Sequence, residues 1–153
     1  IIVTGDRGEG LGEHGEKRHG LLIYQSTLHV PLIIRAPKGG VRGSQVDEGV
    51  SLVDIVPTVL SLIGLSASRQ VQGVDLRGYL EGTGVPDREW PIYGESLWPT
   101  LYECSPLYGI VDGEWKYIRS PNPELYDLSR DGGEKANVVG KEPQISQRLQ
   151  HGC

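Results

Sequence analysis

Hydrophobic residues fall into short runs separated by glycine and proline, and this spacing predicts several short elements rather than a few long ones. The β-branched run Ile1–Thr4 predicts a buried interior strand of a parallel sheet. Residues 5–20 carry six glycines among charged side chains and predict a long loop. Loops of this length in compact domains are usually functional or disordered. Pro31–Ala36 predicts the next strand, ended by the proline and glycines that follow.

A helix is predicted to begin near Asp54. The segment Ser51-Leu52-Val53-Asp54 resembles a capping arrangement, with an acidic side chain near the positive end of the helix dipole. Pro57 is compatible with a helix only in the first turn. Gly64 predicts the end of the helix. The apolar face that this helix predicts consists of Ile55, Val56, Val59, Leu60 and Ile63.

After Pro86 the pattern changes to short strands with a hairpin signal. Asp112-Gly113 predicts a tight turn, which could extend into Glu114. Pro143–Gln150 predicts a terminal helix. We therefore divide the chain into an α/β part, residues 1–85, and a small antiparallel-sheet subdomain, residues 86–153. The strands predicted in the second part are Ile92–Glu95, Leu107–Val111, Trp115–Arg119 and Glu124–Leu128.

Composition limits the classes of partner. The net charge of −5 over 153 residues argues against nucleic acid and against an anionic membrane surface, since both need a concentrated basic surface. The longest apolar stretch, Ile55–Leu65, is too short and too interrupted to span a bilayer. The chain contains no methionine and opens inside a predicted strand, which suggests that it was cut from a longer protein.

The loop of residues 5–20 holds the candidate chemistry. Asp6 follows a predicted strand, and ligands of open α/β sheets bind beyond the carboxyl ends of strands. Its carboxylate suits a hard cation such as Ca²⁺ or Mg²⁺, although a single Asp could equally cap a turn. His14 and His19 lie among acidic residues and could serve as general acid, anion contact or metal ligand. Their spacing matches no zinc motif, and two solvated loop histidines are the alternative interpretation.

Four segments together resemble the sulfatase family. Ile2–Gly15, which reads I-V-T-G-D-R-G-E-G-L-G-E-H-G, is similar to the segment usually written T-S-D-H-G-E-x-L-G-D/E-H-G. His19-Gly20, Tyr24 and Val30–Ile34 follow as they do in that family. The other matches occur in the family's order up to about residue 137: Val53–Leu60 with Ile63-Gly64 resembles D-x-x-P-T-x-L-x-x-x-G, Gln72–Leu76 resembles Q/D-G-x-S/D-L, and Glu124–Leu128 with Asp131, Glu134 and Asn137 resembles E-L-Y-D-L-x-x-D-P-x-E-x-x-N.

The resemblance implies an α/β chain with part of an alkaline-phosphatase-like fold. It would contain the end of the main mixed sheet with its helices, a small C-terminal antiparallel sheet and a terminal helix. The implied activity is hydrolysis of a sulfate ester, in a small molecule or glycan, around a divalent cation that is usually Ca²⁺. The family's nucleophile is a formylglycine made within C/S-x-P-x-R, a motif expected upstream of Ile1, in the missing N-terminal half. Cys104-Ser105-Pro106 begins like that motif but has Tyr108 in place of the arginine, and we interpret it as an ordinary loop.

The resemblance also assigns roles within the loop. Asp6 matches a metal-ligating aspartate, and His19 matches a Lys or His that contacts the sulfate group and is the candidate catalytic residue. Arg7 stands where the family has His or Asn as the next ligand, and a guanidinium has no lone pair to donate. Either Arg7 swings out and water fills its place, or the protein is a degenerate, inactive member. The role of His14 stays open.

Three functions follow from these observations. The leading hypothesis is the C-terminal part of a sulfatase, inactive by itself because the nucleophile is absent. A phosphoesterase or phosphonate hydrolase of the same superfamily is the alternative within the enzymes. A catalytically dead binding module is the alternative outside them, favoured by Arg7.

Overall fold

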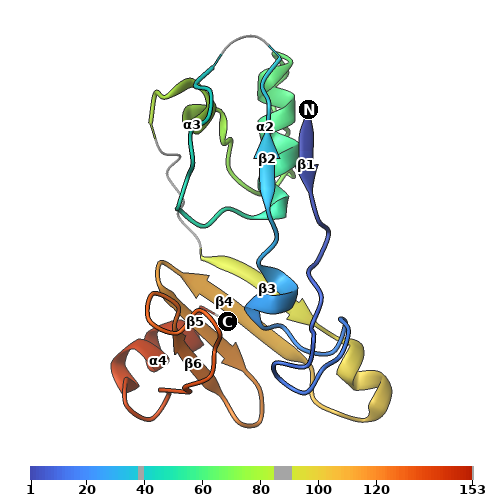
Figure 1. Cartoon of the computed structure of the whole chain (residues 1–153), viewed down its shortest axis with the longest axis vertical. Helices are drawn as coiled ribbons and strands as arrows, with labels where there is room; N and C mark the ends of the chain where they lie inside the picture. The colour runs from blue at the N-terminus through green and yellow to red at the C-terminus, as the bar shows by residue number, and fades with distance from the viewer. Residues whose placement is uncertain (38–39, 85–90, 153) are drawn as a thin grey trace. The chain divides into compact units, whose positions relative to one another are not determined.

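The computed structural model describes residues 1–37, 40–84 and 91–152. The chain divides into two compact units that alternate along the sequence (Figure 1). The first unit comprises Ile1–Thr4 and Pro31–Trp90, and the second comprises Gly5–Val30 and Pro91–Cys153. The predicted boundary at residues 85 and 86 lies outside the described residues. The loop of residues 5–20 falls within the second unit. Within the described residues, no helix has the length and apolar character needed to cross a membrane.

The first unit begins with a strand pair. Strand β1 (Ile2–Thr4) pairs antiparallel with β2 (Leu32–Ile34), and Val3 lies opposite Ile33. Both of these side chains are exposed, so the prediction of a buried parallel strand is wrong for β1 as the structure describes it. A β-branched run favours an extended backbone, but it specifies neither the direction of the pairing strand nor what covers the side chains.

The longer helix of the first unit is anchored by two buried polar side chains, Asp54 and Thr58. The 3₁₀ turn η1 (Leu52–Asp54) leads into α2 (Ile55–Leu62), as predicted. The buried carboxylate of Asp54 accepts hydrogen bonds from the backbone nitrogens of Ser51 (2.7 Å) and Val74 (2.9 Å). Gly64 follows the helix with φ of +77°, the left-handed conformation expected at a helix end.

Thr58 extends this anchor toward the segment that follows α2. Its hydroxyl donates to the carbonyl oxygen of Asp54 at 2.6 Å and accepts from the backbone nitrogen of Leu76 at 2.9 Å. Gly73 has φ of +90°, and a Cβ at that position would lie 2.5 Å from the carbonyl oxygen of Val53. The segments around Asp54 and Gly73, which matched two separate motifs in the sequence, therefore pack directly against each other. Helix α3 (Arg77–Glu81) follows the second segment.

The second unit is built on a four-stranded antiparallel sheet. Its strands run in the order β3 (Ile92–Ser96), β4 (Leu107–Asp112), β5 (Trp115–Arg119) and β6 (Glu124–Asp127), and all four confirm predicted strands. The 3₁₀ helix η2 (Trp98–Tyr102) follows β3. Because Asp112 pairs with Trp115, the hairpin turn consists of Gly113 and Glu114, one residue later than its predicted centre. Gly113 has the positive φ, +59°, that such a tight turn favours.

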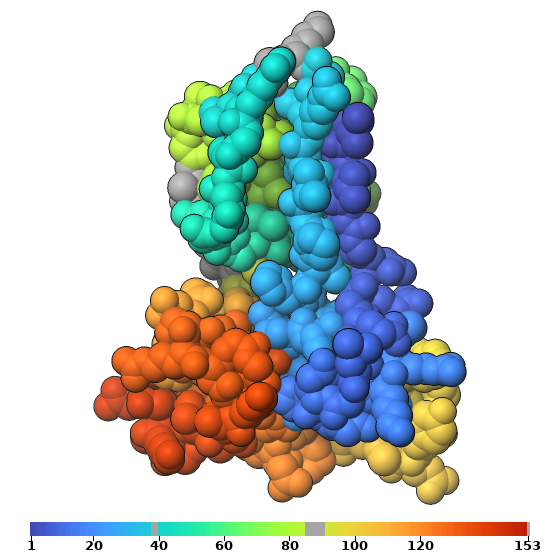
Figure 2. Space-filling view, in the orientation of Figure 1, coloured from blue at the N-terminus to red at the C-terminus, as the bar shows by residue number. Residues whose placement is uncertain are grey.

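Each face of this sheet is covered by a different segment. On one face, Leu149 of helix α4 (Pro143–His151) packs with Ile110, Tyr117 and Leu125. On the other face, Ile118 and Tyr126 pack against Ile23, which precedes the short helix α1 (Gln25–Leu28). Residues 5–30, drawn in blue, lie at the surface of the second unit (Figure 2). The terminal helix is thus confirmed, and Ile23, just after the loop of residues 5–20, is part of the second unit's core.

Candidate functional site

The predicted site residues all lie in the loop of residues 5–20, which close backbone contacts shape. The nitrogen of Gly8 donates to the carbonyl oxygen of Thr27 at 2.8 Å, and that of Gly10 donates to Arg18 at 2.7 Å. A Cβ on Gly8 would lie 2.1 Å from the carbonyl oxygen of Ser26, and one on Gly10 would lie 2.7 Å from that of Arg18. A larger residue at Gly8 would therefore force the loop away from α1, and one at Gly10 would push apart two stretches of the loop itself.

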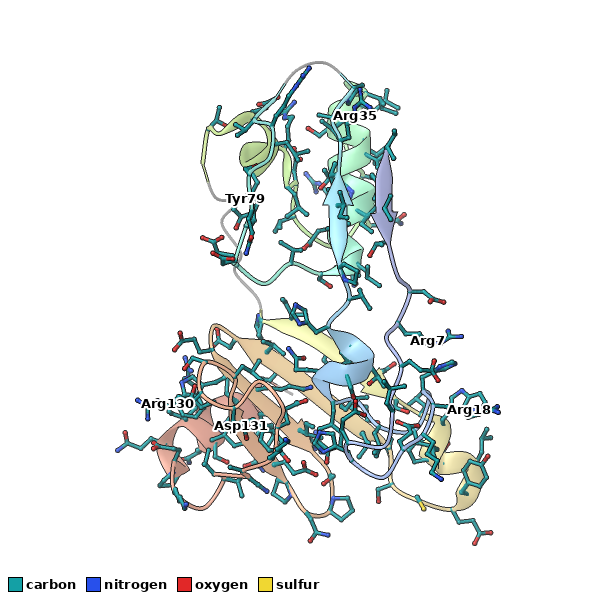
Figure 3. The ribbon with its side chains drawn as sticks, in the orientation of Figure 1. Arg7, Arg18, Arg35, Tyr79, Arg130 and Asp131 are labelled. Carbon is teal, nitrogen blue, oxygen red and sulfur yellow. The ribbon has the colours of Figure 1, made fainter. Side chains whose placement is uncertain are left out.

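Asp6 and Arg7 form an ion pair on the outside of this loop. Oδ2 of Asp6 lies 3.1 Å from Nη1 of Arg7, and the two side chains are 82% and 52% exposed. Figure 3 shows the Arg7 side chain extending away from the ribbon. Ion pairs exposed in this way contribute about 0–1 kcal/mol. Little energy therefore opposes separation of Arg7 from Asp6.

His19 is held by a carboxylate from the same loop. Its Nδ1 lies 2.7 Å from Oε2 of Glu9, and the imidazole is 34% exposed. A carboxylate at that distance assigns the proton to Nδ1, so Nε2 is the ring nitrogen that faces away from Glu9. The neighbouring Gly20 accepts a hydrogen bond from Ser96 at 2.7 Å, which ties this part of the loop to the end of β3. His19 therefore has a carboxylate partner within the loop, and its imidazole remains partly exposed.

His14 is also fixed, by an aromatic contact. Its ring stacks on that of Tyr24, with centroids 3.6 Å apart and planes 14° from parallel. The Tyr24 hydroxyl donates to Oε2 of Glu124 at 2.8 Å, and the Tyr126 hydroxyl donates to the same oxygen at 2.5 Å. Burial, reinforced by the Glu124 carboxylate, raises the pKa of Tyr24 to about 12. Tyr24 thus stays a neutral platform for His14 across the physiological range.

A buried ion pair lies beneath α1, and our sequence reasoning did not find it. Nζ of Lys116, on β5, lies 2.6 Å from Oε1 of Glu134, and the two side chains are 0% and 1% exposed. Burial lowers the pKa of Lys116, and the Glu134 carboxylate opposes that shift. The sequence carried two signals: a lysine within the apolar strand Trp115–Arg119, and a glutamate in the last matched motif. Neither signal indicates that the two residues interact with each other.

In the described part of the chain, no set of further ligands gathers around Asp6. Among residues 1–37, 40–84 and 91–152, no three or more His, Cys, Asp or Glu side chains gather where they could hold a metal ion. Arg7 is the polar neighbour that Asp6 contacts, and it cannot coordinate a cation. The described residues thus do not gather enough ligands to form a cation site by themselves.

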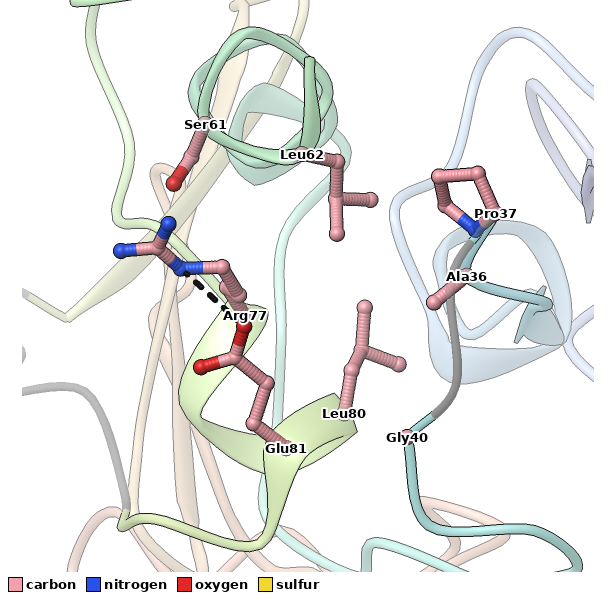
Figure 4. Close-up of a pocket in the computed structure, with 8 residues that line it drawn as sticks. All are labelled: Ala36, Pro37, Gly40, Ser61, Leu62, Arg77, Leu80 and Glu81. Carbon is pink, nitrogen blue, oxygen red and sulfur yellow. Dashed lines mark ion pairs between the residues drawn. The ribbon is translucent and has the colours of Figure 1, made fainter. Parts of the chain in front are cut away.

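Two other features of the chain contain none of the predicted site residues. A cavity of about 130 Å³ in the first unit lies beside Leu62 and Leu80, with the Arg77–Glu81 ion pair at 3.8 Å in its wall (Figure 4). Cys104 is an exposed, free thiol in the loop after η2, as the interpretation of Cys104-Ser105-Pro106 as an ordinary loop expects.

Known proteins similar to this chain decide the family. Residues 12–151 match the family described as N-sulphoglucosamine sulphohydrolase, C-terminal. The chain belongs to this sulfatase family. It is 30% identical to arylsulfatase K of Mus musculus over 97% of its own length, and 32% identical to an N-acetylglucosamine-6-O-sulfatase of Bacteroides thetaiotaomicron over 92%. It spans 28% and 26%, respectively, of these relatives' lengths.

Solved structures confirm the predicted fold. The phosphonate monoester hydrolase of Silicibacter pomeroyi superposes with a TM-score of 0.79 at 28% identity, over 99% of this chain and 33% of that one. Solved sulfatase structures share the fold over the same 99% of the chain. The alkaline-phosphatase-like α/β fold, with its small antiparallel sheet and terminal helix, is therefore correct.

Proposed function

We propose that this chain is the C-terminal part of a sulfuric ester hydrolase. The sulfate group of the bound substrate would lie against the loop of residues 5–20. Support comes from the family match over residues 12–151 and from two relatives that are both sulfatases. The observation that carries the site assignment is the His19–Glu9 pair, an imidazole oriented by a carboxylate at 2.7 Å.

His19 would act on the sulfate oxygens through Nε2. With Nδ1 donating to Glu9, a protonated His19 presents Nε2–H to an anionic oxygen, and charge-assisted hydrogen bonds of this type are about twice as strong as neutral ones. A donor held in place before reaction stabilises the charge that develops on the sulfate oxygens without reorganising.

The nucleophile and the cation belong to other parts of the proposed enzyme. A formylglycine segment C/S-x-P-x-R does not occur in the 153 residues, and the proposal places it in the preceding polypeptide. A divalent cation, Ca²⁺ in our proposal, would polarise the sulfate, and Asp6 is the carboxylate that this chain would contribute to it. Because the described donor set is incomplete, the chemistry assigned to this chain is limited to His19 and Glu9.

The proposal is tested in the complete protein with 4-nitrophenyl sulfate. We expect His19→Ala to lower kcat/KM by about 10²–10³, the usual loss when one preorganised donor is removed. His151→Ala is the matched control, because this histidine lies on α4 with Nδ1 against the carbonyl oxygen of Gln147. Unchanged kcat/KM in His19→Ala would remove His19 from the site.

A phosphonate monoester hydrolase is the second candidate, favoured by the 28% identity to a protein of that name. The same preparation assayed with 4-nitrophenyl phenylphosphonate separates the two activities. A higher kcat/KM on the phosphonate ester would move the assignment to that activity. Turnover of neither ester, in protein whose formylglycine is verified by mass spectrometry, would support the dead-module hypothesis.

A further inference from the structure

The buried Lys116–Glu134 pair is an expensive feature for a small antiparallel sheet. Both side chains are fully removed from water, and the cost of dehydrating two charges can exceed their attraction. Glu134 also has φ of +53°, a left-handed conformation that is unfavourable for a residue with a Cβ. Dehydration of two charges and an unfavourable backbone conformation at Glu134 both oppose this ion pair. A role other than stabilising the fold would explain why the pair is present.

Contacts of the pair converge on the first residue of α1. Oε2 of Glu134 accepts from the backbone nitrogen of Gln25 at 2.5 Å, and Nζ of Lys116 donates to Oε1 of Gln25 at 3.4 Å. Helix α1 has four residues, and its N-cap, Tyr24, makes no capping hydrogen bond with its side chain. The Glu134 carboxylate, 109 residues away along the chain, therefore takes the place of the missing cap.

Helix α1 and its cap in turn hold two points of the functional loop. The nitrogen of Gly8 donates to Thr27 at the close approach that only glycine permits. The His14 ring stacks on Tyr24, and Nζ of Lys116 lies 5.9 Å from the centroid of the Tyr24 ring. Gly8 precedes Glu9, the carboxylate that orients His19.

These contacts form one path from the sheet to the site. We propose that Lys116 and Glu134 are positioning residues, which fix α1 through Gln25 and thereby set the placement of Gly8, His14 and the Glu9–His19 pair. The claim that these residues place the loop does not depend on the protein's activity. The claim that they affect catalysis rests on the proposed sulfatase function.

Two variants of the 153-residue chain test the path by different routes. Gln25→Pro removes the N–H that Glu134 accepts, and proline is tolerated at the first position of a helix. Tyr24 has φ of −74° and ψ of 167°, the extended conformation that a following proline favours. Lys116→Met with Glu134→Gln removes both charges together and leaves no unpaired buried ion. The control is Arg148→Met with Asp112→Asn, which removes an exposed pair at 3.0 Å between α4 and β4.

The readout is NMR of the His14 ring protons and of the Gly8 and Gly10 amides. In the unaltered chain, stacking on Tyr24 should shift the His14 ring protons upfield. We expect this shift to be lost and both amide signals to move in Gln25→Pro and in the double variant, and to persist in the control. Unchanged signals in either folded variant would overturn the proposal, even if its melting temperature falls.

Kinetics of the complete protein give the catalytic consequence. We expect Gln25→Pro to lower kcat on 4-nitrophenyl sulfate by about 10- to 100-fold, since misplacement by about 1 Å can cost that much. If kcat is unchanged while the NMR signals are altered, Lys116 and Glu134 position the loop but do not affect catalysis, and the catalytic claim is overturned. Absence of sulfatase activity in the unaltered protein would instead count against the proposed function, and the NMR result would be unaffected.

Discussion

Two ion pairs of the second unit have the same chemistry and opposite surroundings. Asp6 and Arg7 lie 3.1 Å apart with side chains 82% and 52% exposed, whereas Lys116 and Glu134 lie 2.6 Å apart at 0% and 1%. Water screens the first pair, so its members can exchange partners at little cost. The second pair has no water to replace a lost partner. The ion pair that can separate easily, Asp6–Arg7, thus lies on the outside of the loop. The pair that cannot, Lys116–Glu134, lies beneath α1.

Removal of one buried partner should have the largest effect on stability. Glu134→Ala leaves the Lys116 ammonium buried and unpaired, and we expect it to lower the free energy of unfolding by about 3–5 kcal/mol. Urea unfolding followed by circular dichroism measures the change. A loss below about 1 kcal/mol would mean that Lys116 is neutral or reaches water in the variant, and the contrast between the two pairs would disappear.

A smaller effect is expected from Tyr24 at alkaline pH. Because burial and Glu124 raise the pKa of Tyr24 to about 12, the folded chain retains a proton that the unfolded chain loses near pH 10. The contribution of Tyr24 is therefore fully present below pH 10 and is lost as the pH rises toward 12. The lowered pKa of Lys116 acts in the opposite direction, with stability rising as the pH approaches the unfolded value of 10.5.

Comparison with Tyr24→Phe isolates this contribution, because Lys116 is common to both proteins. We expect the difference in unfolding free energy between the original chain and Tyr24→Phe to be constant from pH 7 to 9 and to shrink between pH 10 and 12. A difference that does not depend on pH would show that the Tyr24 hydroxyl ionises equally in both states.

The exposed pair should give the smallest change in stability. Arg7→His is expected to alter the free energy of unfolding by no more than about 0.5 kcal/mol. In the complete protein it should raise the affinity for Ca²⁺ by about tenfold, within the range seen when groups around a metal change. Isothermal titration calorimetry measures the affinity, and Arg18→His, in another exposed loop arginine, is the control. Equal affinity in Arg7→His and the original protein would place Arg7 outside the coordination shell.

Local pattern accounts for most of the elements that the sequence predicted correctly. Alternation of apolar residues located the four strands of the second unit, and the residues around Asp54 located the start of α2. The burial of Asp54 was not predictable in the same way, since its carboxylate accepts a hydrogen bond from Val74, 20 residues later. Strand direction failed at β1 because pairing is a property of two segments.

The candidate site divides along the same line. Asp6 and His19 could be named as candidates from the sequence because both lie in the loop of residues 5–20, and the structure gives His19 a partner from the same loop, Glu9. The groups that hold the motif in place were missed. Tyr24 meets Glu124 across 100 residues, and Gln25 meets Glu134 across 109, distances at which periodicity carries no information.

These sequence separations also determine how long the loop segment waits for its partners during protein synthesis. The segment that covers one sheet face and carries the site leaves the ribosome about 100 residues before Glu124 and Glu134, its partners. At about 5–20 residues per second, it waits roughly 5–20 seconds with Ile23 and Tyr24 uncovered. During that interval the nascent chain exposes apolar side chains that chaperones recognise. Within this chain, the loop that is proposed to perform the chemistry is therefore synthesised well before the residues that hold it in place.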